Sequence, residues 1–303
     1  MSNDFLPEVL WSYAPDFHLY EQAGVPDWLD ELDLTPAPPN LKMGTRAVDV
    51  NDCLRLDQFR DSEISLRNRL LDEQRGVVFA ARVSADDASL ETLDLVRRFL
   101  AGRGEPAPTL SGHLHPLEAA GRLVQEDLCV MMRRDNDWHL DAAVLCFPSL
   151  WSLQEKFGES TKGLHRNVAH YAEELAPRVD RFFDRLKPGQ AVWRRNLSIK
   201  AYPLLFLPQR KAFNVAANVD IADDGSPFWL RTERQTLQVL PRSGAILFTI
   251  KLQLAPARVL LTRPDRARDL LALYRSLDEG LTTYKTAGNP LSETFLPWLG
   301  RIS

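Results

Sequence analysis

A row of polar side chains lies inside a segment that otherwise has the pattern of a β-strand. The segment, FWLRTERQTLQVL, spans residues 228–240, and its centre holds Arg231, Glu233, Arg234 and Gln235. Burying an arginine or a glutamate costs several kcal/mol unless the charge is paired and hydrogen-bonded. The row therefore indicates either a polar ligand or an internal ion pair between Arg231 and Glu233.

The turn PRSG, which follows this segment, predicts which of these side chains point the same way. It leads into a second strand, residues 245–254, whose alternate side chains are apolar. If Leu240 pairs with Ala245 across the turn, the odd-numbered members of the row face the apolar side of the sheet. A register shifted by one residue would turn Arg234 to that side instead, so both arginines remain candidates.

The histidines form no recognisable metal site. His165 and His170 are five residues apart, about 140° around a helix, so they do not share a helical face. His113 and His115 alternate in a proline-rich loop, without an acidic or cysteine residue beside them. A zinc site built on either pair is therefore disfavoured.

The cysteines are odd in number, widely spaced, and form no CxxC pair; they are Cys53, Cys129 and Cys146. This usage argues against a disulfide framework, a zinc ribbon and an iron–sulfur site held by this chain alone. The last two lie in apolar runs and are expected to be buried core thiols. No GxGxxG, P-loop, GxSxG or HExxH motif is present. Redox chemistry would therefore require a bound cofactor.

Composition excludes several classes of protein. The chain has 303 residues, of which 45% are hydrophobic and 26% charged, as in a globular protein with a substantial core. Its net charge of -4 lacks the basic excess that nucleic-acid binding usually needs. The longest apolar run, GAILFTI, is far shorter than the roughly 20 residues that span a bilayer. We expect a cytoplasmic protein with no nucleic-acid or membrane partner.

Periodicity predicts the elements that position the polar row. Helical spacing is expected over residues 61–74, 89–101, 175–186 and 264–284. Strand patterns are expected at 127–132, 139–146, 193–201, 228–240 and 245–254, the first two forming a hairpin. The Gly- and Pro-rich stretch 102–116 predicts a long loop or boundary.

These elements predict an α+β fold: an antiparallel sheet with flanking helices, a helical N-terminal region and a C-terminal helix. We expect four regions along the chain. They are an irregular arm packed on the core at 1–43, a mainly helical region at 44–115, the sheet domain at 116–262, and the C-terminal helix and tail at 263–303.

Six segments, taken in order, resemble the haem-dependent oxidative N-demethylase alpha-subunit family. They are MGTRAVD (43–49), VQEDLCVM (124–131), VLCFPSLWSLQEKFGES (144–160), GLHRNVAHY (163–171), VDRFFDRLKPGQAVWRRN (179–196) and LRTERQTLQVLPRSGAILFTIK (230–251). The resemblance spans roughly residues 43–258, and six ordered segments are far more specific than any one of them.

The resemblance implies a PAS-like fold that holds a haem b. It implies oxidative removal of a methyl group from a small secondary amine such as dimethylamine, with O2 activated at a His-ligated haem and formaldehyde released. Electrons would come from NADPH through separate reductase subunits that carry FMN and a [2Fe–2S] centre, and tetrahydrofolate could accept the formaldehyde. The alternatives are a haem-binding sensor or carrier without turnover, and a member that binds no haem.

The resemblance also implies roles for particular residues. The family's histidine after the Phe-Pro-Ser element falls on His165, which would be the axial haem ligand. The family's Arg-x-Glu-Arg-Gln-Thr element falls on the polar row, whose two arginines suit the haem propionates. Lys156 and Arg194 are further cationic candidates. Leu197 stands where the family usually has tryptophan, which predicts an altered pocket wall and a different amine.

Overall fold

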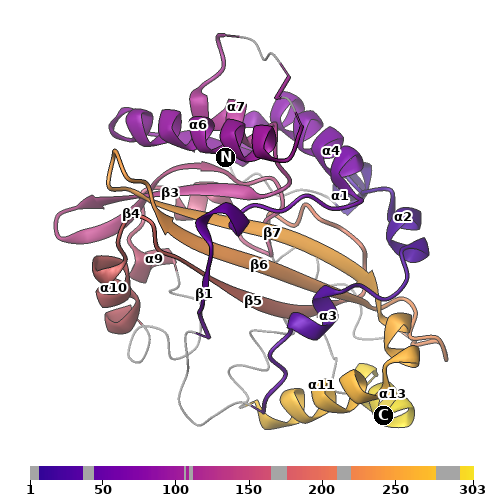
Figure 1. The fold of residues 1–303 in the computed structure, drawn as a ribbon. Helices are drawn as coiled ribbons and strands as arrows, with labels where there is room; N and C mark the ends of the chain where they lie inside the picture. Colours follow the sequence, from indigo (N-terminus) through magenta and orange to yellow (C-terminus); the bar gives the residue numbers. More distant parts are fainter. Residues whose placement is uncertain are drawn as a thin grey trace.

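The computed structural model describes residues 7–36, 44–105, 107–108, 112–164, 176–209, 220–277 and 294–303. Within this part of the chain, the strands form one seven-stranded sheet with the order β1-β5-β6-β7-β3-β4-β2 (Figure 1). Every neighbouring pair is antiparallel. The strands are β1 Arg46–Val48, β2 Phe79–Ala81, β3 Asp127–Arg134, β4 Asp137–Val144, β5 Ala191–Lys200, β6 Trp229–Val239 and β7 Ile246–Pro256.

The sheet and its flanking helices confirm the predicted α+β class. The helices are α1 Pro7–Ser12, α2 Phe17–Gln22, α3 Trp28–Glu31, α4 Arg60–Glu73, α5 Arg75–Val78, α6 Asp86–Gly102, α7 Pro116–Gly121, α8 Leu153–Lys156, α9 Thr161–Leu164, α10 Ala176–Arg185, α11 Pro264–Ser276 and α13 Phe295–Ile302. Helices α4, α6 and α10 match three predicted segments within a few residues. Helix α11 begins at the predicted proline, and the end of that segment lies outside the described residues. None of the described helices is long and apolar enough to cross a bilayer.

Two tight hairpins follow from local turn chemistry. Asp135 and Asn136 join β3 to β4, and both take positive φ angles, 52° and 64°. Asp and Asn tolerate this left-handed conformation, which two-residue hairpin turns require. Between β6 and β7 the predicted register is confirmed, since the Leu240 amide donates to the Ala245 carbonyl at 2.8 Å and Gln235 pairs with Ile250.

This register gives β6 two different sides. We call the side of the sheet that carries Arg231, Glu233 and Gln235 the Glu233 face, and the opposite side, which carries Arg234, the Arg234 face.

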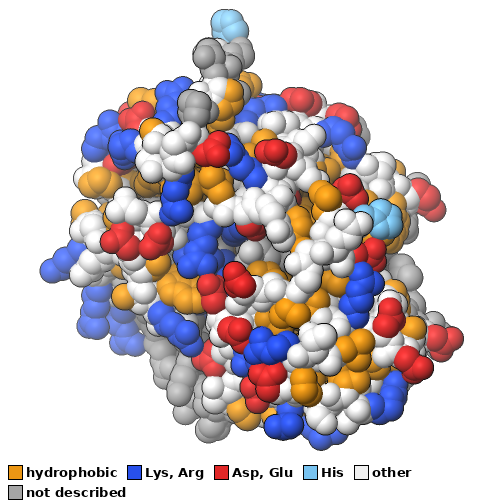
Figure 2. Space-filling view, turned by 45° about the vertical axis from the view of Figure 1, so that its right-hand side comes forward, with side chains coloured by type: hydrophobic (Ala, Val, Ile, Leu, Met, Phe, Trp, Pro, Cys, Tyr) orange, Lys and Arg blue, Asp and Glu red, His pale blue; other side chains and the backbone are white. Residues whose placement is uncertain are grey.

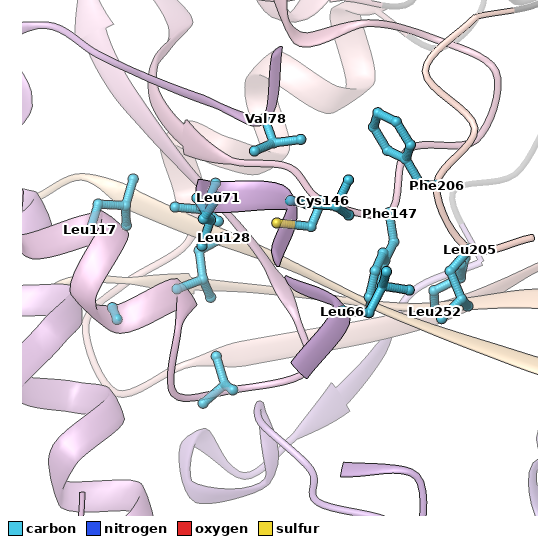
Figure 3. Close-up of a cluster of buried hydrophobic side chains, with 14 of the residues drawn as sticks. Leu66, Leu71, Val78, Leu117, Leu128, Cys146, Phe147, Leu205, Phe206 and Leu252 are labelled. Carbon is cyan, nitrogen blue, oxygen red and sulfur yellow. The ribbon is translucent and has the colours of Figure 1, made fainter. Parts of the chain in front are cut away.

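Helices α4, α6 and α7 cover the Arg234 face (Figure 1). Their apolar side chains pack with strand residues such as Leu128 and Leu247 in one buried cluster. The cluster also contains Phe147 and Leu252, which lie beside Leu66 in the close-up of Figure 3. A second cluster on the same face joins the end of β5 to α3, α11 and α13.

The Glu233 face has its own core at the β3–β4 end of the sheet. Cys129, Ile246 and Ile250 pack there with Leu153 of α8 and Phe183 of α10. Three short helices, α1 to α3, occupy the arm that was expected to be irregular, and its Tyr13, Tyr20 and Trp28 are buried. These three side chains of the described part of the arm pack on the core.

Candidate functional site

The centre of the Glu233 face is only partly covered. Its half-buried side chains lie on three adjacent strands: Val192, Arg194, Asn196 and Ser198 of β5, Glu233, Gln235 and Leu237 of β6, and Phe248 of β7. On the opposite side of β6, in contrast, Thr232, Arg234 and Thr236 are buried. An accessible face on interior strands, with polar and apolar side chains together, is suited to a ligand.

A chain of hydrogen bonds links the polar side chains of this face. Arg194 Nε donates to Gln235 Oε1 at 2.8 Å, and Gln235 Nε2 donates to Glu233 Oε2 at 2.7 Å. The other carboxylate oxygen of Glu233 accepts a hydrogen bond from the hydroxyl of Ser149. The structure therefore places four polar side chains from three segments in one connected row.

Arg231 points to the same face, but its guanidinium forms hydrogen bonds mainly with backbone carbonyls. Its guanidinium donates to the carbonyls of Leu204 and Leu205 at 2.6 and 3.0 Å, and to that of Pro148 at 3.0 Å. Its Nε donates to the Ser149 hydroxyl at 3.2 Å, so the charges of Arg231 and Glu233 are joined through that hydroxyl. Burial lowers the pKa of Arg231 to about 10, and its position indicates a structural clamp.

A buried ion pair, in addition to Arg231, supports the loop that carries Ser149. Asp127 accepts hydrogen bonds from the backbone amides of Cys146 and Phe147 at 2.7 and 3.0 Å. Arg67 Nη1 lies 2.7 Å from the Asp127 carboxylate, and both side chains are buried. Arg67 and Asp127 thus help to hold Ser149 beside Glu233.

Arg234 belongs to the other side of the sheet. It donates to the carbonyls of Cys53 and Asp52 at 3.0 and 2.7 Å, and it lies over the ring of Trp193. Leu197 also lies on the Arg234 face, within the cluster of α3, α11 and α13. Leu197 therefore does not line the Glu233 face, because alternate residues of β5 point to opposite sides.

The predicted histidine ligand, His165, lies outside the described residues, as does His170. Lys156 is buried at the end of α8 and donates to the carbonyl of Gly163 at 3.3 Å, two residues before His165. His115 caps α7 and contacts Asp86, as a structural histidine does. In the described ranges, no group of three or more His, Cys, Asp and Glu could hold a metal ion.

The three cysteines are free and buried, which confirms the prediction for Cys129 and Cys146. Burial raises the pKa of Cys53 to about 11 and that of Cys146 to about 12, and it raises the pKa of Cys129 further. Neutral buried thiols are poor nucleophiles, so these residues act as core side chains.

A family model described as haem-dependent oxidative N-demethylase, alpha subunit-like, matches residues 104–291, more than half of the chain. The chain belongs to this family. The matched region includes the polar row of β6, the loop with Ser149, and the His165 segment. The family description indicates haem dependence and an oxidative N-demethylase. Its term alpha subunit implies an assembly with other subunits.

The Glu233 face of this family member has side chains that fit a haem. A haem offers a flat apolar ring and two carboxylates. Leu237 and Phe248 are paired, half-buried apolar residues on adjacent strands, and Arg194 lies on the same face. A guanidinium forms charge-assisted, bidentate hydrogen bonds with a carboxylate. Arg194 is therefore the described cation best placed to hold a propionate.

Sequence reasoning did not identify Ser149, Asp127 or Arg67 as site residues. Ser149 stands in the Phe-Pro-Ser element of a resembling segment, which was the available signal. The Arg67–Asp127 pair has no local pattern, because its members are 60 residues apart in the chain.

Proposed function

We propose that the protein is the haem subunit of an oxidative N-demethylase that acts on a small secondary methylamine such as dimethylamine. The observation that carries the proposal is the half-open centre of the Glu233 face, where apolar Leu237 and Phe248 adjoin Arg194. This face lies within the region that matches the family. Leu197 points away from it, so that substitution gives no reason to favour a bulkier amine.

In this proposal His165 would hold the haem iron, as the resemblance implies. Arg194 and Gln235 hold the propionate side of the haem, and Glu233 with Ser149 forms a hydrogen-bonded acceptor next to them. Lys156 positions the His165 segment through the Gly163 carbonyl. Arg231 and Arg234 keep the loops on the two sides of β6 in place, and act on the site through them.

The bound haem b supplies oxygen activation, and the protein supplies the pocket and the orientation. Overall, the methylamine, O2, two electrons and two protons give a carbinolamine and water. The carbinolamine then breaks into the demethylated amine and formaldehyde. We expect the electrons to come from NADPH through separate subunits with FMN and a [2Fe–2S] centre, and tetrahydrofolate to accept the formaldehyde.

The first test is an absorption spectrum of the protein reconstituted with haem. Wild type should show a Soret band, and His165→Ala should lose or shift it while far-UV circular dichroism stays unchanged. His18→Ala is the matched control, because His18 is an exposed histidine of α2 that lies outside the matched region. An unchanged spectrum in the His165 variant would move the axial ligand to another residue, and no Soret band in wild type would refute haem binding.

The second test is turnover. With a competent reductase, haem-loaded protein should consume NADPH and O2 and release formaldehyde from a small methylamine. If the haem is reduced and no aldehyde forms across a panel of secondary and tertiary methylamines, a haem sensor or carrier would replace the enzyme.

A further inference from the structure

Charge is distributed unevenly along this chain. The first 41 residues contain eight Asp or Glu and no Lys or Arg, whereas residues 176–200 contain seven Lys or Arg and two Asp or Glu. Helices α1 and α2 of the acidic arm lie on one side of the molecule, and α10 lies on the opposite side (Figure 1). Figure 2 shows Lys and Arg side chains interspersed with Asp and Glu over the face in view. In the fold, arginines of the core pair with carboxylates of the arm, as Arg195 does with Glu31 and Arg263 with Asp30, so the charge of α10 is considered by itself.

Helix α10 has one apolar and one basic side. Phe183 faces the core, where its ring packs edge-on against Trp138 with centroids 6.0 Å apart. Arg181 and Arg185, four residues apart, share the outer side and are exposed. Exposed Lys187 and Lys162 flank them, and we call these four residues the α10 basic face.

The two carboxylates of α10, Asp180 and Asp184, are engaged elsewhere. Asp180 accepts a hydrogen bond from the Thr161 hydroxyl at 2.5 Å. Asp184 accepts one from Trp138 Nε1 at 3.0 Å and pairs with Arg133. Among the residues that the structure describes, no ion pair involves any member of the α10 basic face. Its charge is thus available to a partner.

The position of this face suggests which partner. Helices α9 and α10 flank residues 165–175 in the chain, which contain the proposed axial ligand. Electron-transfer encounters use small, weak interfaces, and complementary charge directs them and raises their association rate. We infer that the α10 basic face is the docking surface for an acidic surface of the electron-delivering subunit. This inference rests on the proposed function.

The test measures binding rather than turnover. The probe is a reduced [2Fe–2S] ferredoxin of net negative charge, mixed with full-length protein at low and high salt. Arg181→Glu combined with Arg185→Glu should slow association roughly tenfold or more at low salt and flatten its salt dependence, because surface charge acts mainly on the association rate. Haem reduction by dithionite should be unchanged.

The matched control is Arg268→Glu combined with Arg275→Glu, which makes the same charge change on the exposed side of α11. Circular dichroism checks that both double variants are folded. Equal effects of the two double variants, or no binding by wild type at low salt, would overturn the docking surface even if a Soret band is present. A missing Soret band alongside binding that depends on α10 would instead count against the haem function alone.

Discussion

Arg231 and Glu233 show how two charges in one polar row take different roles. Arg231 is buried and donates to backbone carbonyls from two loops, so the peptide dipoles stabilise its positive charge. Glu233 is half-buried and accepts hydrogen bonds from Ser149 and Gln235. The first residue holds the loops beside the Glu233 face, and the second one lies on the partly covered centre of that face.

Glu63 is a buried carboxyl group of α4, one of the helices that cover the Arg234 face. It accepts hydrogen bonds from the Tyr20 hydroxyl at 2.6 Å and from Gln125 Nε2 at 2.7 Å. Burial raises its pKa to about 7; the charge of Lys251 opposes this shift, and that of Asp57 contributes to it. This residue links the N-terminal arm to the core and titrates near neutral pH.

This raised pKa predicts how stability depends on pH. Between the unfolded value of 4.5 and about 7, the folded state retains a proton that the unfolded state has lost. The contribution of Glu63 to stability is therefore full below pH 4.5 and is lost as pH rises through 7. Glu63→Gln should remove this dependence, so its stability relative to wild type should rise by about 2 to 3 kcal/mol between pH 5 and 8.

Urea unfolding of both proteins across this pH range measures the effect. Glutamine keeps two polar atoms for Tyr20 and Gln125, since the tyrosine hydroxyl can also accept a hydrogen bond. A constant stability difference at every pH would show that Glu63 is ionised throughout.

At the scale of elements, α7 approaches β4 through a glycine. A Cβ at Gly121 would lie 2.6 Å from Val144 Cγ1. The Gly121 carbonyl also accepts a hydrogen bond from Arg67, so the helix cannot shift away without weakening the support of the Ser149 loop. The close contact thus connects helix packing to the candidate site.

Gly121→Ala should destabilise the fold by about 1 to 3 kcal/mol, as overpacking does. Gly76→Ala in α5 is the matched control, because nothing lies within 4 Å of its added Cβ, and it should be neutral or stabilising by up to about 1 kcal/mol. Thermal or urea unfolding compares the two. Equal stability of both variants would mean that α7 is not packed so closely.

At the scale of the whole molecule, the N-terminal arm is part of the fold. Arg266 donates to the carbonyls of Leu29 and Leu32, each at 2.9 Å, and Arg263 pairs with Asp30 at 2.6 Å. The arm also contributes Trp28 to the cluster with α11 and α13. Ion pairs, hydrogen bonds and an apolar cluster therefore attach the arm to the C-terminal part of the fold.

Two tryptophans of the arm provide a comparison within one segment. Trp28 is 6% exposed and Trp11 is 47% exposed. Trp28→Ala should cost about 3 to 5 kcal/mol, since it leaves a cavity, whereas Trp11→Ala should change stability by about 0.5 kcal/mol or less. Urea unfolding monitored by circular dichroism measures both. A small effect for Trp28 would contradict an arm that is integral to the core.

The sequence by itself determined the features that depend on neighbours in the chain. The turn after Leu240 predicted the β6–β7 register, and with it the side of the sheet that Arg231 and Glu233 share. Helical spacing predicted α4, α6 and α10, because apolar residues must line one side of a helix that packs on a core. The ordered segments indicated the family that the match to residues 104–291 shows.

Only the tertiary structure decided which groups meet across long distances in the chain. The partners of Arg231 lie 26 to 84 residues away, and β3 pairs with β7 across more than 100 residues. The tertiary structure also decided that the centre of the Glu233 face is partly open and that Leu197 lies on the other side of the sheet. Local pattern cannot specify these contacts, because packing of the whole sheet sets which backbone carbonyl or apolar cluster each side chain reaches.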